Sequence, residues 1–193
     1  MAATAVLVLA DWGQTIAGSS FVPGGPLDET AHVLTMLIVL WALGDRVRER
    51  LGIAALVASV AIDVDHVPQY LGFDFLTRGT PRPYSHSLLT IAVVLLLAAV
   101  WRRRRDCLMG VALGLVVHFW RDLSEAGSGV ALLWPFSDHS FSLPRTSYVL
   151  IMSAVVALDA WKCRSGRPRS SGRWSGAWPV SDGSPFRQRD RHA

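Results

Sequence analysis

The sequence predicts an all-α fold: an integral membrane helical bundle of about five short transmembrane helices, followed by a disordered C-terminal tail. Three observations support this prediction. Hydrophobic residues make up 51% of the 193 residues. Charged residues make up only 18%, below the ~25% of a typical soluble domain, and the mean hydropathy is +0.32. Finally, arginine clusters alternate along the chain with apolar runs, as the charge rule for consecutive membrane spans requires.

Five apolar stretches are the candidate helices: residues 30–44, 51–62, 87–101, 107–120 and 147–161. Each is shorter than the ~20 residues that cross a hydrocarbon core. The third and fourth lengthen to residues 84–101 and 107–123 if their polar ends are helical. Runs such as "LLTIAVVLLLAAVW" are apolar on every face, which suits lipid or complete burial better than a half-exposed surface.

The connections between these stretches predict the topology. Three positions are strongly basic, with Arg46, Arg48 and Arg50, then Arg102 to Arg105, and finally Lys162, Arg164, Arg167 and Arg169. The alternate connections carry only Arg78 and Arg82, then Arg121 and Arg145. Because basic residues favour the cytoplasmic side, we expect a multi-pass inner (plasma) membrane protein with its N-terminus outside and its C-terminus in the cytoplasm. A soluble helical bundle would have no reason to alternate its arginines.

Composition divides the chain into a membrane-embedded helical domain at residues 1–162 and a disordered basic tail at residues 163–193, which is rich in Arg, Ser, Gly and Pro. The N-terminus has a short apolar stretch without a basic region before it, so we interpret it as mature chain. The net charge of +4 resides in the connections and the tail, and we expect no nucleic-acid partner. Cys107 and Cys163 form no CxxC pair, which predicts neither a disulfide framework nor a thiolate zinc site.

Histidine and acidic side chains gather at four helix ends that this topology places on one membrane face. Asp28, Glu29 and His32 begin the first helix, Asp63, Asp65 and His66 end the second, His86 begins the third, and His118 and Asp122 end the fourth. Asp28 and His32 are four residues apart, as are His118 and Asp122, so each pair projects from one side of its helix. Imidazole nitrogens and carboxylate oxygens are ligands of zinc and other divalent cations. The alternative interpretation is an ion-paired network in which Arg78, Arg82 and Arg121 tether the helix ends.

Three sequence blocks occur in a distinctive order: "IDVDH", "RGTPRPYSHSLL" and "HFWRDLSEAGSGVALLWPFSDHSFSLP". Over roughly residues 28–161 they resemble the membrane-bound metal-dependent hydrolase family, also described as LexA-binding, inner-membrane-associated hydrolases. The resemblance implies an integral membrane protein with His and Asp metal ligands and a hydrolytic activity. The matching positions are His32, the acidic block Asp63, Asp65 and His66, then Ser85-His86-Ser87, then His118 and Asp122, and the closing Trp134-Pro135-Phe136-Ser137.

Two positions depart from the family pattern. Ile62 replaces the proline that usually precedes the first aspartate, and Thr77 stands before Arg78-Gly79 where a histidine is common. The histidine missing at position 77 would have been a further ligand or substrate contact.

The first functional hypothesis is a membrane-bound metal-dependent hydrolase. One or two divalent ions, zinc first among them, would activate water to attack an ester such as the phosphoester of a lipid or an envelope precursor. The predicted ligands are His32, Asp63, Asp65, His66, His86, His118 and Asp122. We expect Glu29 to act as general base and Arg78, Arg82 and Arg121 to bind an anionic substrate. The expected partners are membrane lipid and a small-molecule or lipid substrate, with the site on the extracytoplasmic face.

The second hypothesis is a non-enzymatic membrane scaffold or transporter that uses the same polar groups to bind metal. A transport path should place ionisable residues at mid-span, whereas the middles of all five stretches are free of them. The sequence therefore favours a site at one membrane face.

Overall fold

The computed structural model describes residues 2–17, 24–125 and 129–165, and within these ranges the regular elements are all helical. In chain order they are α1 (Ala2–Ala17), α2 (Gly24–Leu43), α3 (Asp45–Ala61), the 3₁₀ helix η1 (Ile62–His66), α4 (Val67–Tyr70), α5 (Leu88–Val100), the 3₁₀ helix η2 (Arg102–Arg104), α6 (Arg105–Leu123) and α7 (Arg145–Arg164). The prediction of an all-α fold is confirmed. The predicted tail lies almost wholly outside the described residues.

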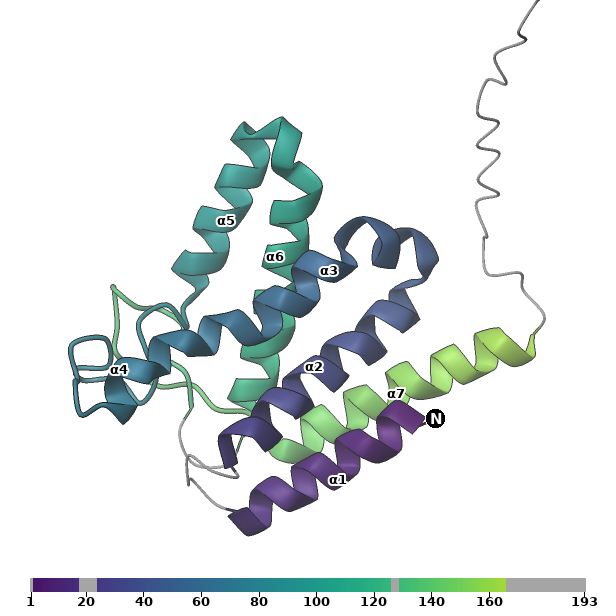
Figure 1. Ribbon diagram of the computed structural model, residues 1–193, viewed down its shortest axis with the longest axis horizontal. Helices are drawn as coiled ribbons and strands as arrows, with labels where there is room; N and C mark the ends of the chain where they lie inside the picture. The colour runs from purple at the N-terminus through teal and green to yellow at the C-terminus, as the bar shows by residue number, and fades with distance from the viewer. Residues whose placement is uncertain (1, 18–23, 126–128, 166–193) are drawn as a thin grey trace, which may run out of the picture.

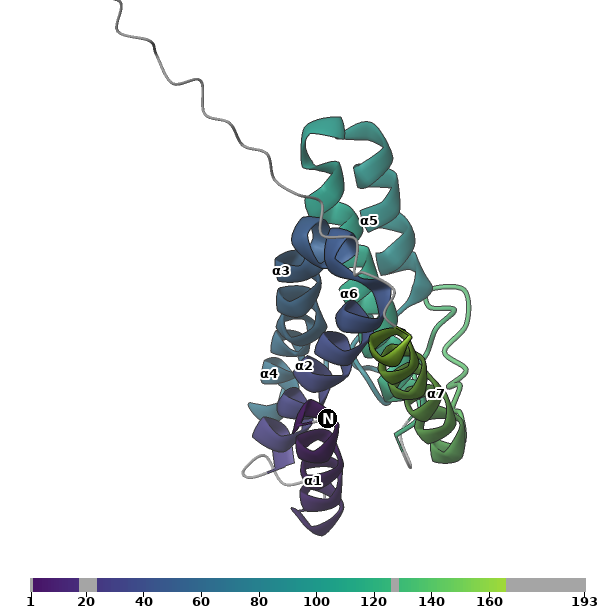
Figure 2. The same cartoon turned by 90° about the vertical axis from the view of Figure 1, so that its right-hand side faces the viewer.

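The helices pack around α2 and α6. Helices α1 and α7 both lie against α2, α3 packs between α2 and α6, and α5 folds back on α6 as a hairpin (Figures 1 and 2). Three buried apolar clusters join them. The first connects α1, α2 and α7 through residues such as Leu7, Ile38 and Met152. The second connects α2, α3 and α6, and the third connects α5 and α6.

Helices α3 and α6 approach until their backbones touch. A Cβ atom added at Gly110 would lie 2.6 Å from the carbonyl oxygen of Leu51, and one at Gly114 would lie closer still to that of Ala55. Glycines four residues apart on one helix face allow such an approach, which is common in helical membrane proteins. This contact fixes the end of α3 beside the end of α6, where the predicted site residues are found.

Several helix limits differ from the predicted ones. Residues 84–87 do not extend α5, because the Leu88 amide donates to the carbonyl oxygen of Leu132 and the helix begins only there. Helix α1 was not predicted, since its apolar stretch is short and contains Asp11 and Gly13. Between α2 and α3, Gly44 has a φ of 93°, a conformation that glycine adopts without strain.

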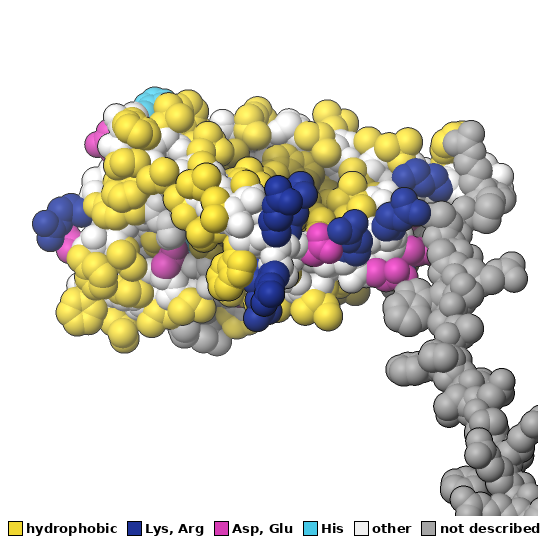
Figure 3. Space-filling model, turned by 90° about the horizontal axis from the view of Figure 1, so that it is seen from above, with side chains coloured by type: hydrophobic (Ala, Val, Ile, Leu, Met, Phe, Trp, Pro, Cys, Tyr) yellow, Lys and Arg dark blue, Asp and Glu magenta, His cyan; other side chains and the backbone are white. Residues whose placement is uncertain are grey.

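Two helical segments of the described chain are long and apolar enough to cross a membrane, Gly25–Leu43 and Asp45–Tyr70. Five membrane spans therefore stay a prediction. Helix α5, with 13 residues, is about 20 Å long, against a hydrocarbon core of about 30 Å. Many large apolar side chains nevertheless point outward, including Ile53, Leu96 and Val100, and hydrophobic side chains cover much of the face seen in Figure 3.

The basic connections gather at one end of the bundle. Arg50 near the start of α3 forms a bidentate pair with Asp106 at the start of α6. Lys162 near the end of α7 donates to the carbonyl oxygen of Ala42 near the end of α2. The starts of α2 and α5 and the ends of α3 and α6 lie at the opposite end (Figure 1). The histidine and acidic residues of interest are therefore separated from the arginine clusters by the length of the helices.

Candidate metal centre

The structure brings all seven predicted metal ligands to one place. Two groups have donor atoms within 4.8 Å of one another and could hold a metal ion: Asp63, Asp65, His66 and His86 form one group, and His32, His118 and Asp122 form the other. The groups are contiguous, because His118 Nε2 lies 3.4 Å from Asp63 Oδ1 and 3.2 Å from His86 Nε2. Ligands from α2, η1, the loop before α5, and α6 therefore share one polar centre.

The tight winding of η1 positions the acidic block. Side chains three residues apart eclipse one another in a 3₁₀ helix, and accordingly Asp63 Oδ1 lies 3.3 Å from His66 Nδ1. Asp65 turns toward the same centre, 3.1 Å from His66 Nδ1 and 3.4 Å from His86 Nδ1. Pro68 does not end the helical path, because it occupies the first turn of α4, where a missing amide hydrogen costs nothing.

Five of the six separations among four donor atoms match those of a tetrahedral metal site. Asp63 Oδ1 lies 3.2 Å from His86 Nε2, and Asp122 Oδ2 lies 3.1 Å from His118 Nε2 and 3.6 Å from His86 Nε2. With the two distances between the groups, this gives five separations of 3.1–3.6 Å. Four ligands held ~2.0–2.1 Å from a tetrahedral zinc ion lie about 3.3 Å apart. These atoms form what we call the His/Asp centre: Asp63 Oδ1, His86 Nε2, His118 Nε2 and Asp122 Oδ2.

Hydrogen bonds behind the centre orient its histidines. His118 Nδ1 lies 2.9 Å from the carbonyl oxygen of Ser59, which can only accept, so Nδ1 carries the proton and a neutral ring offers its Nε2 lone pair to the centre. Asp65 Oδ2 faces His86 Nδ1 and accepts a hydrogen bond from the Ser85 hydroxyl. A carbonyl or carboxylate behind a ligating imidazole is the usual support of a metal site.

The centre is deeply buried and incompletely hydrogen bonded. The side chains of His86, His118 and Asp122 are 0% exposed, and that of His32 is 1% exposed. Within the described chain, no hydrogen bond of good geometry satisfies either ring nitrogen of His32 or either oxygen of Asp122. Buried polar atoms normally have partners, so a shared cation is a chemically reasonable occupant of the space that these atoms face.

The predicted arginines occupy three different environments. Arg82 is buried and pairs with Asp122, at 3.2 Å, and with Glu125. Burial by itself would lower the pKa of Arg82, but the charges of Asp122 and Glu125 outweigh it and raise that pKa above its ordinary value. Arg78 is largely exposed, 3.8 Å from Asp74.

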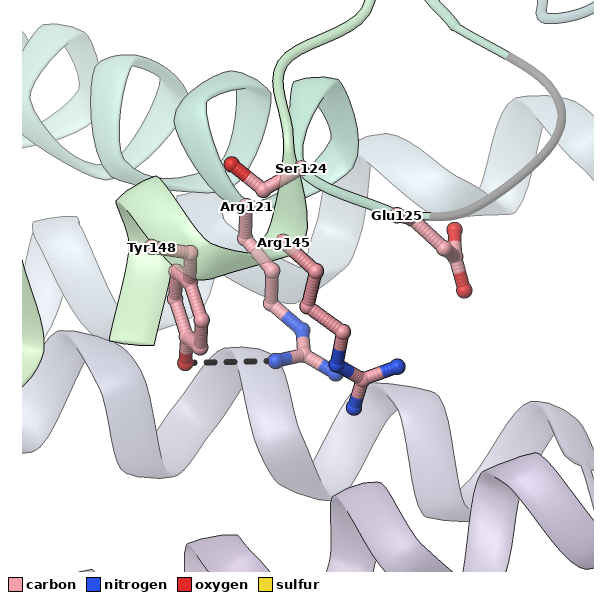
Figure 4. A pocket seen from close by; sticks show the side chains of 5 residues that line it. All are labelled: Arg121, Ser124, Glu125, Arg145 and Tyr148. Atoms are coloured by element: carbon pink, nitrogen blue, oxygen red, sulfur yellow. Dashed lines mark hydrogen bonds between the residues drawn. The ribbon is translucent and has the colours of Figure 1, made fainter. Parts of the chain in front are cut away.

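Arg121 belongs to a second, partly buried cluster, which we call the Arg121 network: Arg121, Arg145, Asp11, Asp28 and Tyr148. Arg121 lies 2.8 Å from Asp11 and 3.5 Å from Asp28, and donates to the Tyr148 hydroxyl at 3.2 Å. Figure 4 shows Arg121 and Arg145 side by side in the adjoining pocket, beside Tyr148. This pocket has a volume of about 20 Å³, which is enough for about one water molecule.

A larger cavity of about 420 Å³ opens beside the His/Asp centre. It is lined by the start of α2, the junction of α3 with η1 and α4, and Arg82. Glu29 and Asp63 both line it, and among the residues that the structure describes, none forms a hydrogen bond of good geometry with the buried Glu29 Oε2. Of the predicted substrate-binding arginines, only Arg82 lines this cavity.

The two departures from the family pattern are accommodated structurally. Ile62 packs against the buried cluster of Ile91, Leu115 and Phe119 beneath the centre. Thr77 is buried, with its hydroxyl 3.5 Å from the carbonyl oxygen of Asp74. In the closing block, Trp134 stacks on Tyr84 with the ring centroids 4.5 Å apart, which fastens the loop after α6 to the loop that carries Arg82 and His86.

Sequence reasoning did not identify several residues that complete the polar region. Asp11 and Glu125 partner the two buried arginines, Ser85 supports Asp65, and the backbone of Ser59 supports His118. Asp11 could have been identified from the sequence, because a lone carboxylate within an apolar stretch generally has a partner or a function. A backbone carbonyl such as that of Ser59 has no side-chain signal.

Two helical segments of membrane-spanning length and apolarity, in the described part of the chain, favour the class of helical membrane proteins. The model of the YdjM inner membrane protein family matches residues 27–180, and the chain belongs to this family. That match supports the inner membrane as its location. No curated protein and no solved structure shows significant similarity to the chain.

Proposed function

We propose that this chain is a membrane-bound metal-dependent hydrolase whose His/Asp centre holds a divalent ion, with zinc as the first candidate. The observation that carries the proposal is the set of five donor separations of 3.1–3.6 Å among four largely buried side chains. Asp63, His86, His118 and Asp122 would bind the ion directly. His32, Asp65 and His66 would orient these ligands or hold a second ion.

The substrate class that the site best supports is a phosphoester of a lipid or an envelope precursor. When bound, the ion would supply Lewis acidity and lower the pKa of water to near neutrality. Glu29 would accept the proton of the attacking water from within the cavity. The new bond joins the water oxygen to phosphorus, the bond to the alcohol oxygen breaks, and the proton passes to that alcohol. Arg82 would hold the phosphate, and Arg121 would act structurally.

Metal analysis of the detergent-purified protein tests the proposal. The wild type should contain about one or two equivalents of a divalent metal, and the double variant His86→Ala, His118→Ala should contain almost none. His139→Ala, which removes an exposed histidine of the loop after α6, is the matched control and should keep its metal. Equal metal content in the double variant and the wild type would overturn the site. A panel of phosphoesters and lipid esters then tests catalysis, where binding without turnover would favour the scaffold.

We also propose that the centre faces the extracytoplasmic side, because the arginine clusters lie at the opposite end of the helices. Cysteine labelling of intact cells tests this orientation in a Cys107→Ser, Cys163→Ser background. An impermeant reagent should label Ser140→Cys, in the exposed loop near the site, and not Arg103→Cys. The reverse pattern would place the site in the cytoplasm.

A further inference from the structure

A long apolar groove runs along the outside of the bundle between α3 and α5. Both helices pack on α6, and the space between them has a volume of about 980 Å³. Its walls are apolar, with Ile53, Val57 and Ala61 from α3, Val94 from α5, and Val111 and Leu115 from α6. The charged residues of the lining lie at its ends, with Glu49 and Arg50 at one end and Asp65, beside Ser85, at the other; Thr90 adds one hydroxyl from α5.

The groove leads to the His/Asp centre. Asp65 lines the groove and also lies 3.4 Å from His86 Nδ1. Ser85 lines it as well and donates to Asp65. Ala61 and Val64 line both the groove and the 420 Å³ polar cavity, so both spaces border the junction of α3 and η1. A molecule lying along the groove therefore ends beside the metal ligands.

The length of the groove matches a hydrocarbon chain. From Arg50 to Asp65 the helical path covers 15 residues, or about 22 Å at ~1.5 Å per residue. One leaflet of a bilayer with a hydrocarbon core of about 30 Å is about 15 Å deep. A lipid chain anchored at the Asp65 end would be accommodated over its full length without leaving the apolar walls.

From these observations we propose that the groove holds a hydrocarbon chain of the substrate, which is a membrane phospholipid that enters sideways between α3 and α5. The phosphate then lies at the end of the groove marked by Asp65 and Ser85, within reach of the His/Asp centre and of Arg82. This inference rests on the proposed function, since it names the substrate class of the same site.

A lipid fits the groove better than a partner helix. A helix with side chains is about 10–12 Å across, and its end would have to lie against Asp65 and His86 at the mouth of the buried centre. A lipid chain leaves its polar head at that position. Because the chain moves between two apolar surroundings, the groove contributes orientation of the phosphate rather than hydrophobic affinity.

Photo-crosslinking tests the proposal with a phosphatidic acid that carries a diazirine near the end of a long acyl chain. Val57 lines the groove and is 60% exposed, whereas Val93 on α5 is 47% exposed and outside the lining. Val57→Trp should fill the groove and reduce crosslinks to α3 at residues 50–57 at least several-fold. Val93→Trp, the matched control, should leave them unchanged, and excess unlabelled long-chain phosphatidic acid should compete where glycerol phosphate does not.

The same samples separate this inference from the proposed function. If metal content follows the His86 and His118 substitutions but crosslinks are equal in the two tryptophan variants, the groove proposal fails alone. A crosslink between two copies of the chain through the groove would also overturn it. If the His86 and His118 substitutions leave the metal content unchanged, the proposed function fails whatever the crosslinks show, and the lipid is then not a substrate.

Discussion

The His/Asp centre and the Arg121 network are both buried ionic clusters at the same end of the bundle, yet their charges are arranged differently. In the network, carboxylates face guanidinium groups, and Arg121 also donates to Tyr148, which in turn bonds Thr35 at 2.7 Å. In the centre, two carboxylate oxygens face two imidazole Nε2 atoms, one of which has no proton to donate when its ring is neutral.

This difference separates a structural ion network from a ligand site. In the network, the guanidinium groups of Arg121 and Arg145 supply the positive charge, and the adjoining pocket has room for about one water molecule. The centre gathers carboxylates beyond those that Arg82 neutralises, and it adjoins a cavity of about 420 Å³. From the sequence alone, an ion-paired network is the alternative to a metal site. The structure contains an ion-paired network around Arg121 and, beside it, a His/Asp cluster that could hold a metal ion. Asp28 joins the two, because it lies between Arg121 and His32.

Metal content should differ most between the two clusters when one carboxylate of each is neutralised. Asp122→Asn removes a predicted ligand and also leaves buried Arg82 short of a partner, so bound metal should be lost. The free energy of unfolding should fall by roughly 3–5 kcal/mol. Asp11→Asn in the network should keep the full metal content. Metal analysis and thermal denaturation in detergent measure both quantities, and retention of metal by Asp122→Asn would remove the distinction between the clusters.

Arg121→Met should show the opposite pattern. It leaves Asp11 and Asp28 without their buried cation, which should lower the free energy of unfolding by roughly 3–5 kcal/mol while metal content stays normal. Arg78→Met at an exposed site is the control and should change stability by no more than about 0.5 kcal/mol. Thermal denaturation of both variants beside the wild type decides the point, and a parallel loss of metal would assign Arg121 to the metal site.

Asp65→Asn should weaken metal binding without abolishing it. If Asp65 supports His86 from behind, its loss should reduce metal affinity by about 10–100-fold. Competition with a chromophoric chelator measures this change, and Ser85→Ala should produce a smaller shift in the same direction. A complete loss of metal in Asp65→Asn would instead identify Asp65 as a direct ligand, as the sequence alone had suggested.

Tyr148→Phe should have the smallest effect. It removes a hydroxyl that bonds Arg121 and Thr35 but keeps the ring in its apolar cluster. The expected loss of stability is about 0.5–1.5 kcal/mol, with metal content unchanged. A change of metal content in this variant would show that the two clusters are energetically coupled.

The helical class and the meeting of histidines with aspartates could be predicted because both depend on local properties. The lengths of the apolar stretches and the positions of the arginines can be read directly from the order of residues. The four-residue spacing of His118 and Asp122 predicts that their side chains meet, and they lie 3.1 Å apart. The number of membrane spans could not be settled in the same way, since α5 is apolar but short.

The atomic pattern of the centre could not be predicted, because it depends on winding and on helix spacing. The 3₁₀ geometry of η1 turns Asp63 and Asp65 toward the same histidines. Nothing in the sequence "IDVDH" predicts a 3₁₀ helix rather than an α-helix at this position. The close approach of α3 and α6 did have a signal in Gly110 and Gly114, four residues apart. Helix α1 was not predicted, because its apolar stretch is short and is interrupted by Asp11 and Gly13.

Ligands drawn from η1, the loop before α5, and α6 have a consequence for biogenesis. Membrane helices insert first and associate afterwards, so no newly inserted helix of this chain carries a complete set of ligands. Before the helices associate, each of these side chains lies at a helix end near the hydrated surface. If the centre holds a metal ion, as proposed above, metal loading would be the last step of assembly. A cell short of metal would then accumulate inserted chains whose helices have not yet closed around the centre.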